Sequence, residues 1–485
     1  MDRREFSKRA LIFGFGAFTA LGKGKSAAGQ TQEDDVCIEP SKKLPIRKFD
    51  VAVVGGGTAG VIAALAAARQ GAKTALIEVK GYTGGTAVEG GTALHSFYNL
   101  WTAFPGAKKR QVVRGIPQEL IDRLIKVGGC SGHAEMEKGL DYDSVCTAID
   151  TELYKLITME MLTEAGVFLA VNTLCAGAVM EGNQIRGAIT ESRSGRELFT
   201  AGTFVDCSAY GDLAAYAGAD FTAPNDYESC NSVGIANVNV EKYRDFLAAN
   251  GGVDQLAYGT RSGREGKIVR VQGELGPEFG DEADKIGMSS VTTTVHDNYF
   301  MFIKCNFKVP GTVLSRDDMA KAEVEVRRRM ARAVELFRKY VPGCEKAFMA
   351  RTSPKLCIRR GRTITCDYDI SHEDVIEGRH FDDDIMVYGF HDFAPRYQIR
   401  NGGTYGLPYK ALRVKGIENL LAAGMMITSD HRAHMSTRNT VCCMGQGQAA
   451  GTAAALCAKK KRGTRELHYG QLRKALENDN VYFEG

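Results

Sequence analysis

A glycine pattern near the N-terminus, Gly55-x-Gly57-x-x-Gly60, restricts the possible folds more than any other part of the sequence. Before it lies an apolar run at residues 51–54, short enough for a fully buried strand. After it, an alanine-rich stretch at 61–69 predicts a tightly packed helix. In this setting Gly55 allows a tight turn, and Gly60 lets the helix pack closely on the strand. The pattern therefore predicts a strand, a glycine turn and a helix in direct succession.

The next apolar run, residues 74–77, is followed by an acidic residue, Glu78. Strand, glycine turn, helix, strand and acid together make the βαβ unit that binds dinucleotides. We expect Gly57, Thr58 and Ala59 to lie against a pyrophosphate, because the first helical turn offers free N–H groups and the positive end of the helix dipole. Glu78 is placed to accept hydrogen bonds from a ribose.

The composition is that of an ordinary globular protein with two or three domains: 485 residues, 44% hydrophobic and 25% charged. The net charge of +4 is small for this length, so the charge balance does not point to nucleic acid or a membrane surface. The 13 cysteines include no Cys-x-x-Cys pair, so we predict neither a zinc site nor an iron–sulfur cluster. Cys442 and Cys443 are adjacent, and a small apolar pair at a helix start is favoured over redox chemistry.

The first residues have the pattern of a signal peptide. Arg3-Arg4-x-Phe-x-Lys is followed by a moderately apolar stretch at 10–21 and then by small residues. The paired arginines are similar to a twin-arginine export signal, which predicts a periplasmic or otherwise exported protein. We place the signal peptide at 1–29 and a flexible, polar leader at 30–47. The apolar stretch is too short to span a membrane and no other stretch is long enough, so we expect no membrane span.

Further glycine-rich segments follow Glu78. A glycine pair, Gly84-Gly85 before Thr86, lets the backbone pass close to a ligand. Residues 167–205 then predict a β-meander with glycine-containing turns. Its last strand leads into a glycine–acid turn that ends at Asp212, and a helix follows.

The middle of the chain, from about 220 to 410, has mixed periodicity and no second nucleotide pattern. Its clearest element is an amphipathic helix at 315–340 with Ser315 as the N-cap. The final part predicts a strand at 416–424 and an alanine-rich helix at 445–457 that opens on glycines, as a nucleotide domain would require. We therefore predict a discontinuous nucleotide domain made of residues 48–220 and 411–460. Residues 221–410 form an inserted substrate or cap domain, and residues 461–485 form a C-terminal tail.

Together these segments resemble the FAD-dependent oxidoreductase family within the glutathione-reductase-like flavoproteins. Its relatives include the heterodisulfide reductase flavoprotein and, more distantly, fumarate-reductase-like enzymes. The resemblance extends from Phe49 to about Lys460 and implies bound FAD. It also implies an α/β fold, with a discontinuous FAD-binding Rossmann-like domain and an inserted α+β substrate/cap domain. The residues it implies at the cofactor are Gly55, Gly57, Thr58, Ala59, Gly60, Glu78, Gly84, Gly85, Thr86, Asp212, Gly424, Gly445, Gly447, Ala449 and Gly451.

Two segments depart from the family's pattern. The middle motif reads Arg359-Arg-Gly-Arg362 without its usual acid, and Cys207-Ser-Ala-Tyr210 stands where Ala-Thr-Gly is usual. Both departures bear on substrate chemistry more than on FAD binding. The iron–sulfur motifs of heterodisulfide reductases are absent from the sequence, so that activity is not expected.

A flavin exchanges hydride at its N5 atom, so the protein must supply a proton-exchanging group and hold the substrate. Histidine titrates in the working pH range, and arginine pairs with a carboxylate or a developing oxyanion. The candidates lie beside the predicted flavin segment and in the predicted cap. Those beside the flavin segment are His431, His434 and Arg438, and those in the cap are Arg362, His391, Arg359 and Arg396.

Three functions fit these features. The first is an exported enzyme that transfers hydride between the flavin and a small organic molecule, such as a sugar or a hydroxy or unsaturated acid. The second is a fumarate-reductase-like reductase of activated C=C bonds in a carboxylate, which the cap arginines favour. The third is a non-enzymatic electron-transfer flavoprotein subunit, which the lack of cluster-binding cysteines disfavours. The expected partners are a small-molecule substrate and an electron acceptor that the sequence does not identify.

Overall fold

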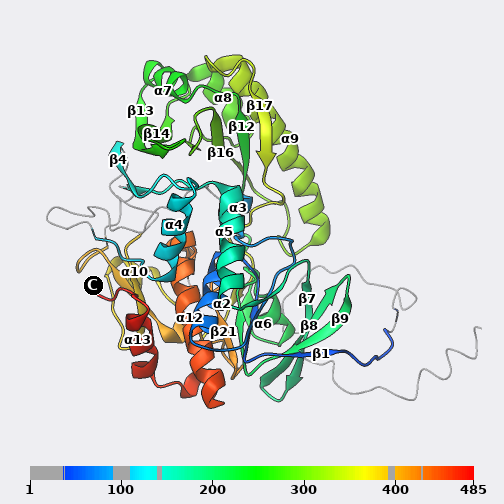
Figure 1. The fold of residues 1–485 in the computed structure, drawn as a ribbon. Coiled ribbons are helices and arrows are strands. Elements are labelled where there is room, and N and C mark those ends of the chain that lie inside the picture. Colours follow the sequence, from blue (N-terminus) through cyan, green and yellow to red (C-terminus); the bar gives the residue numbers. More distant parts are fainter. Residues whose placement is uncertain are drawn as a thin grey trace, which may run out of the picture. The chain divides into compact units, whose positions relative to one another are not determined.

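The computed structural model describes residues 37, 39–90, 110–138, 145–390, 399–427 and 430–484 (Figure 1). The chain divides into a short unit, Met1–Lys43, and a compact unit, Leu44–Gly485, which holds all the elements named below. The predicted signal peptide lies outside the described residues, and so do His391 and Arg396. Within the described part, no helix is both long and apolar enough to cross a membrane.

Five parallel strands form the central sheet, in the order β21–β10–β2–β3–β6. They span Val51–Val54 (β2), Thr74–Ile77 (β3), Phe168–Ala170 (β6), Thr203–Asp206 (β10) and Leu420–Ala422 (β21). Strand β2 has a neighbour on each side and is buried at every position, as is typical of an apolar run in a parallel sheet. The two strands predicted around the glycine pattern are confirmed, and so is the Rossmann-like α/β fold class.

Helices α2 (Thr58–Arg69) and α12 (Thr440–Lys460) pack against each other beside this sheet (Figure 1). Glycine lets their backbones approach closely, because a Cβ added at Gly451 would lie only 2.0 Å from the carbonyl oxygen of Ala63. Both alanine-rich helices predicted from the sequence are confirmed, and each begins earlier than its predicted range.

A second sheet has the order β1–β9–β8–β7 and contains the predicted meander. Its strands are Ile46–Lys48 (β1), Leu174–Glu181 (β7), Gln184–Ser192 (β8) and Gly195–Thr200 (β9). β7, β8 and β9 are antiparallel, whereas β1 pairs with β9 in parallel. The last residues of the predicted leader therefore belong to this sheet. The two ends of the predicted meander instead join the central sheet as β6 and β10.

The cap region is α+β, as predicted. One sheet has the order β16–β12–β17, and the other has the order β15–β14–β13–β4–β5. The predicted helix at 315–340 is confirmed as α9, and the Ser315 hydroxyl accepts the N–H of Asp318 at 3.2 Å. The elements are Ala134–Lys138 (β4), Val145–Cys146 (β5), Ser229–Ala236 (β12), Val240–Ala249 (α7), Val253–Arg261 (β13), Arg264–Gly273 (β14), Pro277–Lys285 (α8), Thr292–Thr293 (β15), Tyr299–Phe307 (β16), Arg316–Tyr340 (α9) and Phe348–Thr352 (β17).

Two segments pack across the boundary that we drew from the sequence. β4 precedes that boundary in the chain, yet it pairs with β13 of the cap. Conversely, Ile364, Tyr388 and Leu407 belong to the core that also holds β2 and α2. The remaining elements are Thr86–Glu89 (α3), Ile116–Lys126 (α4), Thr151–Glu164 (α5), Asp212–Tyr216 (α6), Phe221–Thr222 (β11), Thr363–Ile364 (β18), His372–Ile376 (α10), Asp384–Tyr388 (β19), Tyr405–Pro408 (β20), Tyr409–Leu412 (η2), His431–Thr437 (α11), Thr464–Glu466 (η3) and Tyr469–Asn478 (α13).

Candidate active site

The glycine turn after β2 is shaped by its neighbours. A Cβ added at Gly55 would lie 2.4 Å from the carbonyl oxygen of Cys207, and one at Gly60 would lie 1.8 Å from that of Gly55. Packing therefore requires glycine at both positions. At Gly57, by contrast, the nearest atom is the Cα of Gly85 at 4.0 Å. The backbone of Gly57 thus borders open space at the start of α2.

No side chain caps the start of α2, and its first turn contains no acidic residue. A helix that begins in this way presents unpaired N–H groups and the positive end of its dipole. Thr58 and Ala59 supply the first of these groups. The open space at Gly57 and this uncapped end together suit a phosphate-bearing ligand.

Glu78 is held at the carboxyl end of β3. Its side chain is only 7% exposed, and its Oε2 atom accepts the N–H of Gly56 at 2.6 Å while Oε1 accepts the N–H of Lys80 at 2.9 Å. Each carboxylate oxygen has a further lone pair, so the carboxylate can still accept a hydrogen bond from a ribose hydroxyl.

The second glycine pair lies against the first glycine turn. Gly84 donates its N–H to the carbonyl of Gly56 at 2.9 Å, and a Cβ at Gly85 would lie 2.7 Å from the Cα of Gly57. Thr86 then opens α3. The structure thus places Gly84 and Gly85 beside the first glycine turn, and the contact of these residues and Thr86 with the cofactor stays a prediction.

The returning C-terminal segment is joined to this region by Gln446. Its Oε1 atom accepts the N–H of Gly424 at 2.8 Å, and its Nε2 atom donates to the carbonyl of Thr437 at 2.8 Å. We did not predict this residue, although a polar side chain inside a glycine- and alanine-rich helix is a signal that sequence reasoning can use.

Four predicted cofactor residues of α12 contact protein instead of open space. An added Cβ would approach the Met386 sulfur at Gly445, the Ala59 carbonyl at Gly447 and the Ala63 carbonyl at Gly451, each within 2.5 Å. Ala449 is fully buried. These residues allow α12 to pack against α2. They can affect a bound ligand only by positioning α2. The predicted residue Asp212 accepts a hydrogen bond from Arg362 at 2.8 Å at the start of α6.

Three segments of the chain meet around the ring of Tyr227. The ring centroids of His431 and His434 lie 4.5 and 5.3 Å from that of Tyr227. The guanidinium carbons of Arg360 and Arg438 lie 5.9 and 5.6 Å from the same centroid. These five residues form what we call the Tyr227 cluster, and it contains three of the predicted site residues, His431, His434 and Arg438.

A carboxylate orients one of the two histidines. Asp226 accepts hydrogen bonds from Nδ1 of His431 at 2.8 Å and from Arg360 at 2.9 Å, both at its Oδ2 atom. The His431 side chain is 49% exposed. With Nδ1 as the donor to a carboxylate, Nε2 of the neutral ring carries a lone pair and can accept a proton. Asp226 was not predicted from the sequence.

His434 is placed differently. It is completely buried, and its Nε2 atom donates to the carbonyl of Arg359 at 3.0 Å. Burial lowers the pKa of His434 to about 3, and nearby Arg438 and Arg360 act in the same direction. The ring is therefore neutral at ordinary pH. Its Nδ1 atom has no hydrogen-bond partner among the described residues.

The cysteines near these segments are packed thiols. Burial raises the pKa of Cys442 to about 12, and the Cys443 thiol contacts the carbonyl of Thr437 at 3.7 Å. No group of three or more histidine, cysteine or acidic residues suited to a metal occurs within the described ranges.

The sequence matches the family described as FAD dependent oxidoreductase over residues 50–476. The chain belongs to the FAD-dependent oxidoreductase family. The protein is accordingly an FAD-dependent enzyme, as the resemblance implied. The residues at the glycine turn fit this cofactor, because the space beside Gly57, the uncapped start of α2 and the buried Glu78 suit a pyrophosphate and a ribose.

Several solved structures are similar to this FAD-dependent oxidoreductase at low identity. A geranylgeranyl bacteriochlorophyll reductase-like protein from Thermoplasma acidophilum shares 14% identity, with a TM-score of 0.47 over 89% of this chain and 83% of that one. A myxobacterial chondrochloren halogenase shares 11%, with a TM-score of 0.46 over 89% and 78%. The p-nitrophenol 4-monooxygenase of Pseudomonas putida shares 12%, with a TM-score of 0.43 over 91% of each chain.

Proposed function

We propose that this enzyme transfers hydride between FAD and a small organic anion that carries a hydroxyl group, and that His431 exchanges the accompanying proton. The observation that carries the proposal is the pair formed by His431 and Asp226, in which one ring nitrogen is held and the half-exposed side chain leaves the other available. FAD, when bound, supplies the hydride chemistry at its N5 atom. The remaining task is to move a proton and hold the substrate, and the protein's own side chains perform it.

His431 accepts the hydroxyl proton at Nε2 during oxidation and returns it during reduction. Asp226 keeps Nδ1 protonated and favours the imidazolium that forms. His431 is favoured over His434 as the proton-exchanging group, because His434 is buried and its pKa is far below the working range. His434 instead stabilises the segment that contains Arg359, because its ring donates a hydrogen bond to the carbonyl of that residue.

An anionic substrate is favoured by the arginines around the Tyr227 cluster. The guanidinium carbons of Arg360 and Arg438 lie 5.9 and 5.6 Å from the centroid of the Tyr227 ring, and they reach it from two separate segments. Arginine binds carboxylates in a planar, two-pronged geometry, so a hydroxy acid suits this pair of arginines.

The same arginines also suit the carboxylate of an unsaturated acid. In that second candidate function, His431 donates a proton to one of the two carbon atoms of the C=C bond while that bond is being reduced. An anaerobic screen separates the two functions: hydroxy acids bleach the bound flavin in the first, whereas unsaturated acids reoxidise the reduced flavin in the second.

The residue assignment is tested by His431→Ala in the FAD-loaded enzyme. We expect turnover to fall by roughly a hundredfold or more, since a proton-transfer group is lost, while FAD content and melting temperature stay unchanged. His380→Ala is a matched control, because His380 also pairs with a carboxylate, Asp384 at 3.0 Å, outside the cluster. Wild-type turnover in His431→Ala would contradict the assignment.

Asp226→Asn tests the positioning role of the carboxylate. The change removes the negative charge that favours the imidazolium, so the pH dependence of turnover should shift toward lower pH. A lower rate at every pH with an unshifted profile would indicate a structural role only.

We also propose that the protein is exported through the twin-arginine route. The support is the Arg3-Arg4 motif and the apolar stretch behind it. Changing both residues to lysine keeps the charge but removes the paired guanidinium groups, so the protein should remain in the cytoplasm when fractions are compared by immunoblot. Arg9→Lys lies outside the pair and should be exported normally. Equal export of the double variant would contradict the proposal.

A further inference from the structure

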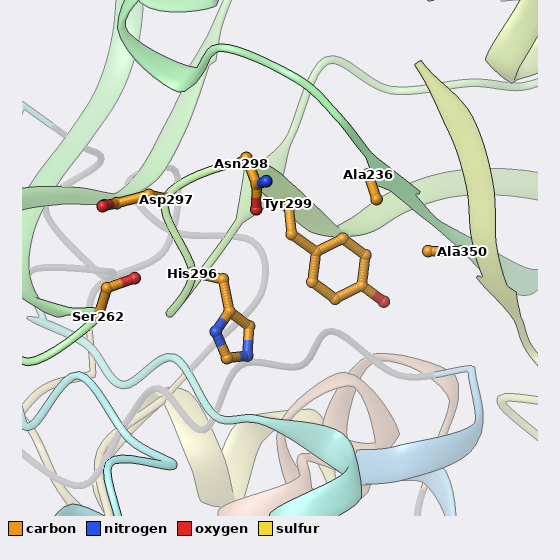
Figure 2. Close-up of a pocket in the computed structure, with 7 residues that line it drawn as sticks. All are labelled: Ala236, Ser262, His296, Asp297, Asn298, Tyr299 and Ala350. Atoms are coloured by element: carbon orange, nitrogen blue, oxygen red, sulfur yellow. The ribbon is translucent and has the colours of Figure 1, made fainter. Parts of the chain in front are cut away.

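The cap region contains an open, shallow cavity of about 470 Å³ that belongs neither to the Tyr227 cluster nor to the FAD cradle, by which we mean residues 55–60, 78 and 84–86. It lies between the turn from β15 to β16 and the hairpin of β13 and β14 (Figure 2). Its volume falls within the range of roughly 300–1,000 Å³ that is typical of small-molecule sites. The lining residues are Ala236, Ser262, His296, Asp297, Asn298, Tyr299 and Ala350.

Two rings form one wall of this cavity. The ring centroids of His296 and Tyr299 lie 6.1 Å apart with 30° between the planes, and Figure 2 shows both rings at the same side of the space. Ala236 and Ala350 continue this wall beside Tyr299. The wall is therefore a shallow apolar surface, suited to the C–H face of a ring-shaped ligand.

Polar groups without partners surround the same space. Among the described residues, no protein group hydrogen-bonds the hydroxyl of Tyr299 or the side chains of Ser262 and Asn298, which are exposed and so accessible to a ligand. His296 uses only Nε2, which contacts Asp150 at 2.6 Å. Because the Asp150 carboxylate holds Nε2, Nδ1 is the ring nitrogen left to contact a ligand. Burial raises the pKa of Tyr299 to about 12, so its hydroxyl remains a donor. The cavity thus offers a mixture of donors and acceptors.

The charges at the cavity are already balanced. Asp297 contacts Arg264, and its Oδ1 atom lies 3.2 Å from Nε of the buried Arg261. Arg261 also pairs with Glu241 at 2.5 Å. Figure 2 shows the Asp297 carboxylate directed away from the rings. Two arginines thus face two carboxylates here, and beside Tyr299 the positive Arg351 faces the negative Asp150 and Glu152, so neither sign of charge dominates the cavity.

We propose that this cavity binds a neutral polyhydroxylated molecule of monosaccharide size. A sugar ring combines an apolar C–H face with hydroxyl groups that both donate and accept, and these match the ring wall and the mixed polar rim. The site is separate from the proposed reaction at His431, and binding here does not require that the ligand be oxidised or reduced.

The test measures binding to the FAD-loaded enzyme by saturation-transfer NMR and calorimetry. The probes are glucose, galactose, mannose and N-acetylglucosamine, with glucuronate as a charged analogue. We expect saturable binding of at least one neutral sugar. Asn298→Ala should weaken it about fivefold or more through the lost hydrogen bonds, and Tyr299→Leu should do so through the lost ring. Asn250→Ala makes the same chemical change elsewhere in the cap and should have no effect.

Three results would overturn the proposal. They are an absence of saturable binding by every neutral sugar, an affinity that Asn298→Ala leaves unchanged, and tighter binding of glucuronate than of glucose. Asn298 is exposed, so its variant should fold normally, and circular dichroism of both pocket variants checks this.

Discussion

Burial disfavours the charged forms of two ionisable side chains near the candidate site. It lowers the pKa of His434 to about 3 and raises the pKa of the fully buried Asp206 to about 6. Asp206 accepts the N–H groups of Ser208 and Ala214, which favour its charged form, yet burial outweighs them. The two residues therefore give opposite slopes to a plot of stability against pH.

His434 should make the protein less stable as the pH falls below about 6.5. The native state keeps the ring neutral while the unfolded state binds a proton, so the free energy of unfolding falls with decreasing pH until about pH 3. His434→Gln keeps a donor for the Arg359 carbonyl and removes this titration. Between pH 7.5 and 5, urea unfolding should show the wild type losing about 2 kcal/mol more than the variant.

Asp206 acts in the opposite direction, since its raised pKa favours the folded state below about pH 4 and this contribution is lost as the pH rises through 6. It is present in both proteins, so the difference between their curves isolates His434. Parallel curves for the two proteins would show that His434 does not titrate as its burial implies.

At this scale the sequence identifies residue types but not their surroundings. The sequence predicted His431 and His434 equally as the proton-exchanging residue, because both follow the same predicted strand. Only the fold reveals that one is half exposed and the other fully buried. Asp226 was not predicted, because it lies 205 residues from His431 in the sequence and no local pattern indicates such a pair.

At the scale of elements, the contact between α2 and α12 depends on glycine. Gly451→Ala places a Cβ against the carbonyl of Ala63, so we expect a loss of about 1–3 kcal/mol in the free energy of unfolding. Gly280→Ala is the matched control, because Gly280 is a helical glycine of α8 with no atom within 4 Å of the added Cβ. It should gain about 0.5–1 kcal/mol through helix propensity. Equal effects in chemical denaturation would contradict this account.

Elements defined by local pattern were predictable, and their partners were less so. The apolar run of β2 and the Ser315 cap of α9 are signals contained within a few residues. The pairing of β4 with β13 depends on residues more than a hundred positions apart in sequence. Such pairings are decided by packing, which periodicity does not encode.

At the scale of the whole molecule, cofactor binding and folding should be coupled. FAD binds the native cradle and not the unfolded chain, so excess FAD should raise the melting temperature by several degrees, equivalent to about 2.7 kcal/mol at a hundredfold excess over Kd. Gly57→Val fills the space beside α2. Its melting temperature should not respond to FAD, and the purified protein should lack flavin absorbance, whereas Gly280→Ala should respond normally. Flavin bound normally by Gly57→Val would show that the cradle lies elsewhere.

The family and cofactor were predictable at this scale because many separate motifs agree across most of the chain. The sequence did not reveal the cap cavity, since its lining comes from β12, the hairpin of β13 and β14, the turn before β16, and β17. None of these segments has a distinctive motif of its own.

The position of β21 in the central sheet determines when during synthesis that sheet can be completed. β21 pairs with β10, and Asn419 just before it hydrogen-bonds the backbone of Ile185, which was synthesised 234 residues earlier. The sheet and the α2–α12 contact therefore cannot close until β21 and α12 have left the ribosome. Contacts of such long range slow folding, because a large loop must close before they form. If FAD binds only the completed sheet, its capture must follow the synthesis of β21, and an assay of nascent chains truncated before residue 420 should find no bound flavin.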